Sequence, residues 1–139
     1  MSAPDRVVFD AEPLIAHAAD EPGCKVVEEY LDAVAVEDIV GYASYVNIVE
    51  IRYTIARKYD RNTADEYLDW LTDLGIKTVD VGDTWTDASK YTLKYKPALG
   101  DSFALATAEH VDATFVVGCD DDYDDVSDIP IERFHDDTA

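Results

Sequence analysis

Cysteines and long hydrophobic runs are scarce in this sequence. Of the 139 residues only two are cysteines, Cys24 and Cys119, and they lie far apart without a C-x-x-C pattern. We therefore expect reduced thiols, and neither a disulfide framework nor a zinc site. The chain has no run of about eighteen apolar residues, which excludes an ordinary transmembrane helix. Its first residues, MSAPDRVVFD, lack the basic and apolar regions of a secretory signal, so we expect a cytoplasmic protein without membrane attachment.

Basic residues are also few. Eleven lysines and arginines oppose thirty-one aspartates and glutamates, giving a net charge of −20. Hydrophobic residues nevertheless make up 47% of the chain and fall in regular runs, which argues against disorder. Such a charge is best tolerated in concentrated salt, where the Debye length is about 3 Å at 1 M. We interpret the charge as adaptation to a halophilic cytoplasm, and expect any RNA contact to depend on metal ions or a local basic patch.

Short apolar strands alternate with amphipathic helices along the chain. Strands are predicted at 6–10, 38–43, 76–81, 114–117 and 131–134. Helices are predicted at 13–18, 24–36, 44–58, 62–74, 83–94 and 100–110, with Pro13 at the first position of its helix and Gly75 as a C-cap. This alternation predicts an α/β fold with a mainly parallel sheet, in a single domain over residues 1–139.

Four acidic residues occupy positions that solubility alone does not explain. Asp10 ends the first strand and Asp120 follows the fourth, where the binding crevice of a parallel sheet forms. Asp122, in the same acidic run, is the alternative to Asp120. Glu50 lies within a mostly apolar helix, where an unpaired carboxylate is costly. Asp101 opens an alanine-rich helix, whose dipole would stabilise its charge.

The order of these acids along the chain carries more information than any one of them. Taken singly, each also fits a helix cap, an exposed side chain or a solvated loop. Together they resemble the PIN-domain family, and within it the VapC-like toxins of toxin–antitoxin pairs. The segments VVFDAEPLIA, NIVEIRYTI and LGDSFALATAEHVDATFVVGCDDDY carry the resemblance over nearly the whole chain. One departure follows the fourth strand. Family members often have Thr-Gly-Asp there, whereas this chain has Val117-Gly118-Cys119, so Cys119 stands where the acid usually follows glycine.

The resemblance implies a three-layer α/β/α fold with about five strands and one acidic pocket. By position, the pocket comprises Asp10, Glu50, Asp101 and Asp120. It implies a ribonuclease that hydrolyses RNA with Mg²⁺ or Mn²⁺, held chiefly by Asp10 and Asp101 and completed by the other two. Grouped carboxylates repel one another, and oxygen ligands suit both ions, so the chemistry agrees. A homodimer and a cognate antitoxin are further implied partners.

Two basic clusters are candidates for holding RNA phosphates. The first comprises Lys90, Lys94 and Lys96, and the second Arg52, Arg57, Lys58 and Arg61. The alternative for both is ordinary salt pairing with nearby acids. Tyr91 and Tyr95 fit either stacking on unpaired bases or packing in the core or a dimer.

Several other functions stay open on the sequence alone. These are a catalytically weak PIN-like module that binds RNA or an antitoxin, and a housekeeping RNA-processing nuclease. A phosphoacceptor receiver domain would need paired acids after the first strand and a lysine after a late one. A haloacid-dehalogenase-like phosphatase would need Asp-x-Asp where this chain has Asp10-Ala11-Glu12. The histidines show no pairing that would support a metal-free ribonuclease.

Overall fold

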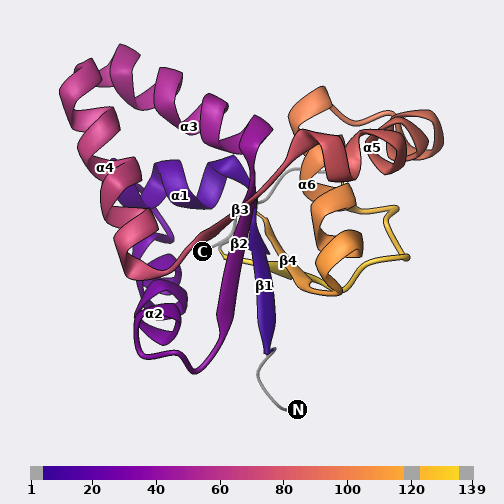
Figure 1. Ribbon diagram of the computed structural model, residues 1–139, viewed down its shortest axis with the longest axis horizontal. Coiled ribbons are helices and arrows are strands. Elements are labelled where there is room, and N and C mark those ends of the chain that lie inside the picture. Colours follow the sequence, from indigo (N-terminus) through magenta and orange to yellow (C-terminus); the bar gives the residue numbers. More distant parts are fainter. Residues whose placement is uncertain (1–4, 118–122, 135–139) are drawn as a thin grey trace.

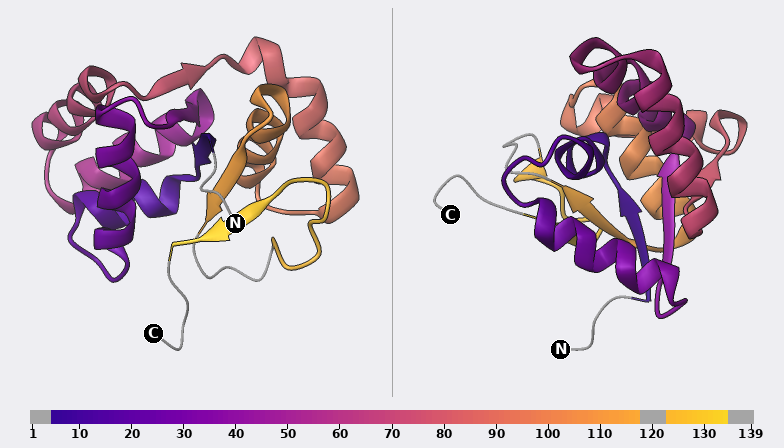
Figure 2. Two further views of the ribbon diagram at one scale, coloured as in Figure 1. Left: turned by 90° about the horizontal axis from the view of Figure 1, so that it is seen from below. Right: turned by 90° about the vertical axis from the view of Figure 1, so that its left-hand side faces the viewer.

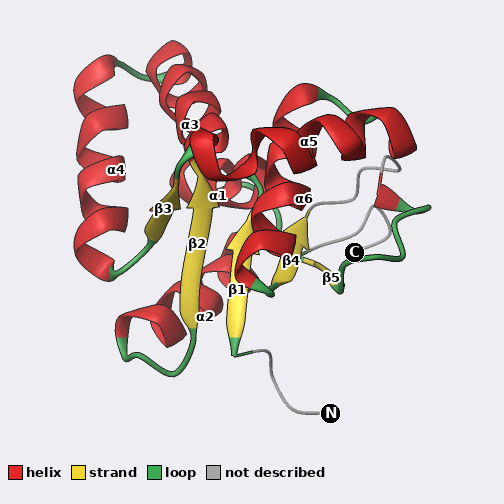
Figure 3. Ribbon diagram, turned by 45° about the vertical axis from the view of Figure 1, so that its right-hand side comes forward, coloured by secondary structure: helices red, strands yellow, loops and turns green. Residues whose placement is uncertain are grey.

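A parallel sheet runs through the middle of the computed structural model, which describes residues 5–117 and 123–134 (Figure 1). Its strands are β1 (Arg6–Phe9), β2 (Val40–Ser44), β3 (Lys77–Val79), β4 (Thr114–Val117) and β5 (Ile131–Arg133). They lie in the order β3-β2-β1-β4-β5, and every neighbouring pair is parallel. The arrowheads of β1, β2 and β4 accordingly point the same way in Figure 3. The predicted α/β fold with about five parallel strands is confirmed.

Helices cover both faces of this sheet. They are α1 (Ala11–Ala18), α2 (Cys24–Ala35), α3 (Tyr45–Lys58), α4 (Arg61–Leu74), α5 (Val81–Tyr95) and α6 (Leu99–Val111). The first four lie on one side of the sheet, and α5 and α6 lie on the other (Figures 1 and 2). The three-layer arrangement is therefore also confirmed. Within the described residues, no helix combines the length and the apolar character needed to cross a membrane.

Alternating side chains in the central strands explain why both faces are covered. Val7 and Phe9 of β1 pack into the core beneath α1–α4, whereas Val8 packs into the core beneath α5 and α6. All three are 0% exposed, so β1 is apolar on both faces. Strands of parallel sheets commonly show this pattern, because helices cover each face.

The direction of chain travel across the sheet reverses beside β1. The chain passes from β1 outward to β2 and β3, then crosses to β4 on the other side of β1 and continues to β5. In open α/β sheets, ligands bind in the crevice beyond the carboxyl ends of the strands at such a reversal. The backbone N–H of Asp10 donates to the Val116 carbonyl of β4 at 3.1 Å, which places Asp10 at this crevice.

The first helix begins earlier than predicted because an aspartate caps it. The Asp10 carboxylate accepts a hydrogen bond from the Ala11 backbone N–H at 2.8 Å, and α1 begins at Ala11. Pro13 is therefore the third helical residue, not the first. It is tolerated there because the first-turn N–H groups have no partner within the helix.

The second and third strands also end differently from the prediction. β2 extends to Ser44, whose hydroxyl then accepts a hydrogen bond from the Val46 N–H at 3.2 Å and caps α3. β3 ends at Val79, not Val81, because α5 already begins at Val81. In both places the strand passes into a helix within one or two residues, and hydrophobic pattern alone does not mark that boundary.

Candidate functional site

Asp10 is buried at the carboxyl end of β1, with 5% of its surface exposed. Its Oδ1 accepts the Ala11 backbone N–H, and its Oδ2 accepts the Tyr123 hydroxyl, each at 2.8 Å. Burial, and then the charge of Asp101, raise the pKa of Asp10 to about 7, although both hydrogen bonds act in the opposite direction. A buried carboxyl group with a strongly raised pKa in a crevice is a candidate functional group.

Asp101 brings a second carboxylate to the same place. It lies in the first turn of α6, where the helix dipole favours negative charge. Its charge raises the pKa of both Asp10 and Glu50. Its charge also raises the pKa of the Tyr123 hydroxyl, which places Asp101 near that group. The structure therefore brings Asp10, Glu50 and Asp101 together from three separate elements.

Glu50 reaches the site from the middle of α3 and is half-buried. The Asn47 side-chain amide, which is 0% exposed, donates to Glu50 Oε1 at 2.8 Å and to the Gly100 carbonyl at 3.2 Å. Burial raises the pKa of Glu50, the Asn47 hydrogen bond lowers it, and the charge of Asp101 raises it further. Asn47 thus ties the glutamate to the residue just before Asp101, and so joins α3 to the start of α6.

Gly100 leaves the space that the Glu50 side chain occupies. A Cβ atom at this position would lie 2.0 Å from Glu50 Oε1 and 2.7 Å from its Cδ. Neither Gly100 nor Asn47 was predicted to belong to the site. One signal was available for Asn47, because it lies three residues before Glu50 on the same face of a largely apolar helix.

Tyr123 is a third site residue that the sequence analysis missed. It is 2% exposed, and burial, followed by the charge of Asp10, raises its pKa, so the phenol keeps its proton and remains a donor. In the sequence it stands within the acidic run CDDDYDD, and nothing there distinguishes it from an ordinary loop tyrosine.

The fourth predicted acid falls outside the residues that the structure describes. Asp120 and its alternative Asp122 lie outside the described residues, as does Cys119. Within residues 5–117 and 123–134, no three His, Cys, Asp or Glu side chains form a group that could hold a metal ion by themselves. Asp10, Glu50 and Asp101 would supply only part of a ligand set. Their oxygen donors and mutual repulsion nonetheless fit a hard divalent cation such as Mg²⁺ or Mn²⁺.

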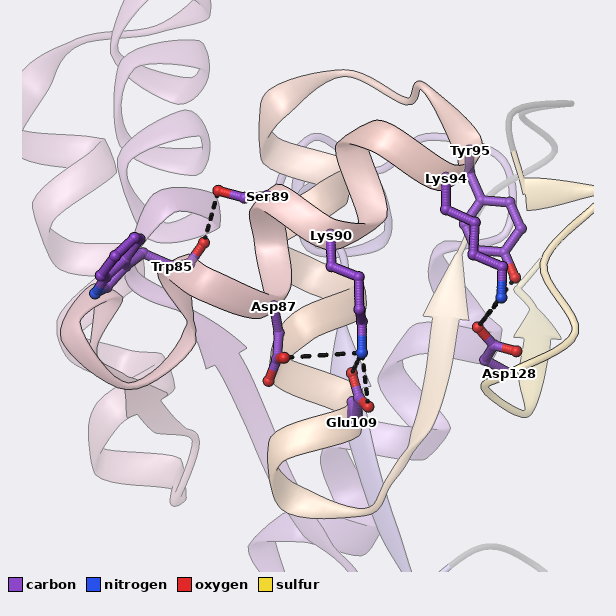
Figure 4. Close-up of polar contacts among 8 residues, drawn as sticks. All are labelled: Trp85, Asp87, Ser89, Lys90, Lys94, Tyr95, Glu109 and Asp128. Atoms are coloured by element: carbon purple, nitrogen blue, oxygen red, sulfur yellow. Dashed lines mark hydrogen bonds and ion pairs between the residues drawn. The ribbon is translucent and has the colours of Figure 1, made fainter.

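The predicted RNA-binding lysines of α5 are paired with acids on the surface (Figure 4). Lys90 Nζ lies 3.2 Å from Glu109 and 3.8 Å from Asp87, and Lys94 Nζ lies 2.7 Å from Asp128. All five side chains are substantially exposed. Exposed ion pairs contribute about 0–1 kcal/mol each, so a phosphate group can compete for these lysines.

The remaining basic candidates divide between paired and unpaired positions. Arg52 pairs with Asp65 of α4 at 2.8 Å. Lys96, which caps α5 in the left-handed conformation with φ of 56°, is exposed and has no ion pair with any described residue. Tyr91 is 1% exposed and belongs to the core, which excludes it from stacking on bases.

Comparison with known families identifies the family to which this chain belongs. The family model of the PIN domain matches residues 7–129, a span that includes Asp10, Glu50 and Asp101. The chain belongs to the PIN domain family. PIN domains are generally nucleases that use divalent metal ions. Membership of this family removes the receiver-domain and phosphatase alternatives.

Solved structures with the same fold include VapBC proteins and a toxin–antitoxin complex. VapBC2 of Rickettsia felis, bound to a promoter DNA fragment, gives a TM-score of 0.74 at 11% identity, covering 92% of this chain and 98% of that one. A toxin–antitoxin complex of Klebsiella pneumoniae gives 0.72 at 18%, covering 94% and 98%. FitAcB of Neisseria gonorrhoeae gives 0.59 at 19%, covering 90% and 95%. At these identities the likeness establishes the fold. No curated protein matches the sequence significantly.

Proposed function

We propose that this protein is a divalent-metal-dependent endoribonuclease and the toxin of a type II toxin–antitoxin pair. The observation that carries the proposal is the burial of Asp10 beside Asp101 and Glu50 at the reversal point of the sheet. Membership of the PIN family supports the nuclease class. The fold shared with structures from toxin–antitoxin systems supports the toxin role.

In this proposal the acids hold the metal and the neighbouring groups hold the acids. Asp10 and Asp101 are the principal ligands, Glu50 assists directly or through water, and Asp120 or Asp122 supplies the fourth carboxylate. Bound Mg²⁺ or Mn²⁺ would supply an activated water and stabilise negative charge on the phosphate. The Ala11 N–H fixes Asp10, and because the pKa of Asp10 is raised to about 7, cation binding there would release a proton near neutral pH.

RNA approaches a protein of net charge −20, so local cations matter. We propose that Lys90, Lys94, Lys96 and Arg52 bind its phosphates. Lys96 has no ion pair with a described residue that a phosphate would have to replace. Lys90, Lys94 and Arg52 would each exchange a surface carboxylate for a phosphate. Such contacts release counterions, so binding through them weakens as salt rises.

Exposed apolar side chains on α3, α5 and α6 support the proposal of a homodimer. They are Val49, Tyr53, Trp85, Leu93 and Leu99, with exposures between 44% and 81%. Leu99 lines two apolar grooves, one with residues of α3 and one with residues of α5. Light scattering should give twice the chain mass of 15.4 kDa, and Leu93→Ser should shift the protein toward monomer. A wild-type monomer at micromolar concentration would contradict the dimer.

A cognate antitoxin is the second proposed partner. It would place a segment across the acidic site, with a basic side chain among the carboxylates. Such a contact would compete with metal, so the antitoxin should inhibit cleavage more strongly at low Mn²⁺ than at saturating Mn²⁺. Inhibition that is independent of Mn²⁺ concentration would argue against this mode.

Cleavage of RNA tests the proposed activity. Single-stranded and structured RNAs would be incubated in about molar KCl, the salt regime that the charge suggests, with Mn²⁺, Mg²⁺ or EDTA. We expect metal-dependent cleavage that both Asp10→Asn and Asp101→Asn abolish. Activity that survives EDTA or both substitutions would contradict the mechanism. A folded, metal-bound protein without cleavage of any RNA would favour the binding module instead.

A further inference from the structure

Tyr123 contributes a polar group to a part of the core that a phenylalanine would fill equally well. Its ring packs edge-on against Phe115 of β4, with centroids 5.1 Å apart and an interplanar angle of 88°. The surrounding cluster is formed by apolar side chains, including Val8 and Phe103. Packing therefore explains the ring but not the hydroxyl, because burying a hydroxyl costs free energy unless it forms a hydrogen bond.

The hydroxyl finds its partners among the acids of the site. It donates to Asp10 Oδ2 at 2.8 Å, and Asp101 lies near enough for its charge to raise the pKa of the hydroxyl as well. The other oxygen of Asp10 accepts the Ala11 N–H at 2.8 Å, so both carboxylate oxygens are held in place. Each ionised carboxylate oxygen has two lone pairs, which leaves one on each for a metal ion or a water.

We propose that Tyr123 is a positioning residue for the metal site, whose hydroxyl fixes the rotation of the Asp10 carboxylate and its place relative to Asp101. This inference rests on the proposed function. The ring packs against Phe115 of β4 and the hydroxyl donates to Asp10, which follows β1, so this side chain links two neighbouring strands. Outer hydrogen-bond partners of metal ligands typically change metal affinity by about 10–100-fold.

The substitution Tyr123→Phe removes the hydroxyl and keeps the ring. Mn²⁺ binding would be measured at pH 8 from the electron paramagnetic resonance signal of the free ion, for wild type, Tyr123→Phe and Tyr67→Phe. Tyr67 is a matched control, because its part-buried hydroxyl donates to the Leu14 carbonyl at 3.0 Å and its ring packs against the other core, the one beneath α1–α4. We expect the Kd for Mn²⁺ to rise about tenfold or more in Tyr123→Phe, and to stay at the wild-type value in Tyr67→Phe.

Three outcomes would contradict the inference, and they separate it from the proposed function. Wild-type protein that binds no Mn²⁺ would overturn both. Wild-type binding with an equal Kd in Tyr123→Phe would overturn the positioning role and leave the proposed function intact. Tighter binding by Tyr123→Phe would show that the hydroxyl competes with the metal, which also overturns the positioning role. Urea unfolding in EDTA would show whether the two phenylalanine variants lose comparable stability, so that a general loss of structure is recognised.

Discussion

The Asp10 carboxyl group is more basic in the folded chain than in the unfolded one. Its folded pKa is about 7, whereas an aspartate in the unfolded chain has its ordinary pKa of 3.8. Below about pH 4 the group is protonated in both states, so its burial does not lower the free energy of unfolding. As the pH rises from 4 to 7, the unfolded chain releases this proton while the folded chain keeps it, so stability falls. Above pH 7 the full cost remains, on the order of 4 kcal/mol.

The substitution Asp10→Asn should therefore stabilise the metal-free protein in a pH-dependent way. We expect the variant to exceed the wild type by a few kcal/mol at pH 8 and by almost nothing at pH 4, because asparagine has no proton to lose. Urea unfolding in EDTA and constant KCl at a series of pH values measures the difference. A difference that stays the same from pH 4 to pH 8 would show that Asp10 is not the buried ionisable group described above.

Gly100 offers a way to move one carboxylate without removing it. In Gly100→Ala the new Cβ would lie 2.0 Å from Glu50 Oε1, so the glutamate must leave its position beside Asn47. Displacements of about 1 Å in a catalytic site can cost 10²-fold in rate, and we expect a loss of that order in RNA cleavage. Stability should change little, since alanine favours the helix by about 1 kcal/mol over glycine.

Gly82 supplies the matched control. It lies in the first turn of α5, and a Cβ atom there would meet nothing within 4 Å. Gly82→Ala should retain wild-type cleavage and be equally or slightly more stable. Equal activity of the two alanine variants would mean that the position of Glu50 does not matter for cleavage.

At the scale of single residues, the sequence indicated acids better than it indicated their supports. Asp10, Glu50 and Asp101 could be predicted because each stands at a distinctive place in its own strand or helix. The supports depend on contacts between distant segments. Tyr123 and Asp10, for example, are 113 residues apart in the chain. No local pattern encodes such a contact, so the fold had to be known first.

At the scale of elements, the strand β2 shows why packing decides more than propensity. Gly41 is the second of its five residues, and glycine inside a strand normally weakens it. Here a Cβ atom would lie 2.8 Å from Ile76 Cδ1 and 2.9 Å from Val34 Cγ2. The missing side chain thus allows β2 to approach the residues around α2 and β3. A strand was predicted here from the sequence, but the close contact of Gly41 with Val34 and Ile76 depends on the packing of separate elements.

A double-mutant cycle tests that close packing. Gly41→Ala should destabilise the fold by about 1–3 kcal/mol, because overpacking displaces neighbouring side chains. Ile76→Val removes the nearest methyl group, so the double variant should lose less stability than the sum of the single changes. Urea unfolding of the four proteins measures the coupling. Strictly additive losses would show that Ile76 does not resist the new methyl group.

The boundaries of elements were the least predictable part of the fold. The alternation of strands and helices followed from hydrophobic patterns, and the parallel sheet followed from that alternation. The starts of α1 and α4 are instead fixed by side-chain caps from Asp10 and Asp60, the latter accepting the Thr63 N–H at 2.7 Å. A helix cap depends on one side chain that accepts one backbone hydrogen bond. So acidic a chain has many aspartates that could cap a helix, and the sequence does not mark which of them do.

At the scale of the whole molecule, the net charge of −20 should make stability depend on salt. We propose that the protein works in a halophilic cytoplasm, where ions screen the repulsion among its acids. The free energy of unfolding should therefore rise steeply between 0.05 M and 1 M KCl, that is, as the Debye length falls from above about 10 Å to about 3 Å. Urea denaturation at each salt concentration measures it.

A charge-reduced variant separates screening from other effects of salt. Glu66, Asp69 and Asp73 are exposed acids of α4. Their replacement by the matching amides changes the net charge from −20 to −17, since three negative charges are removed. This variant should be more stable at low salt and should gain less on adding KCl. A wild-type stability that is flat across this range would count against halophilic adaptation.

The location of bound metal tests the central claim most directly. Crystals grown with Mn²⁺ would be measured at the manganese absorption edge, so that the ion identifies itself by anomalous scattering. The proposed site predicts a strong anomalous peak in contact with carboxylate oxygens of Asp10 and Asp101, and its loss in crystals of Asp101→Asn. No peak at saturating Mn²⁺, or a peak elsewhere with Asp10 still bound only to Ala11 and Tyr123, would contradict it.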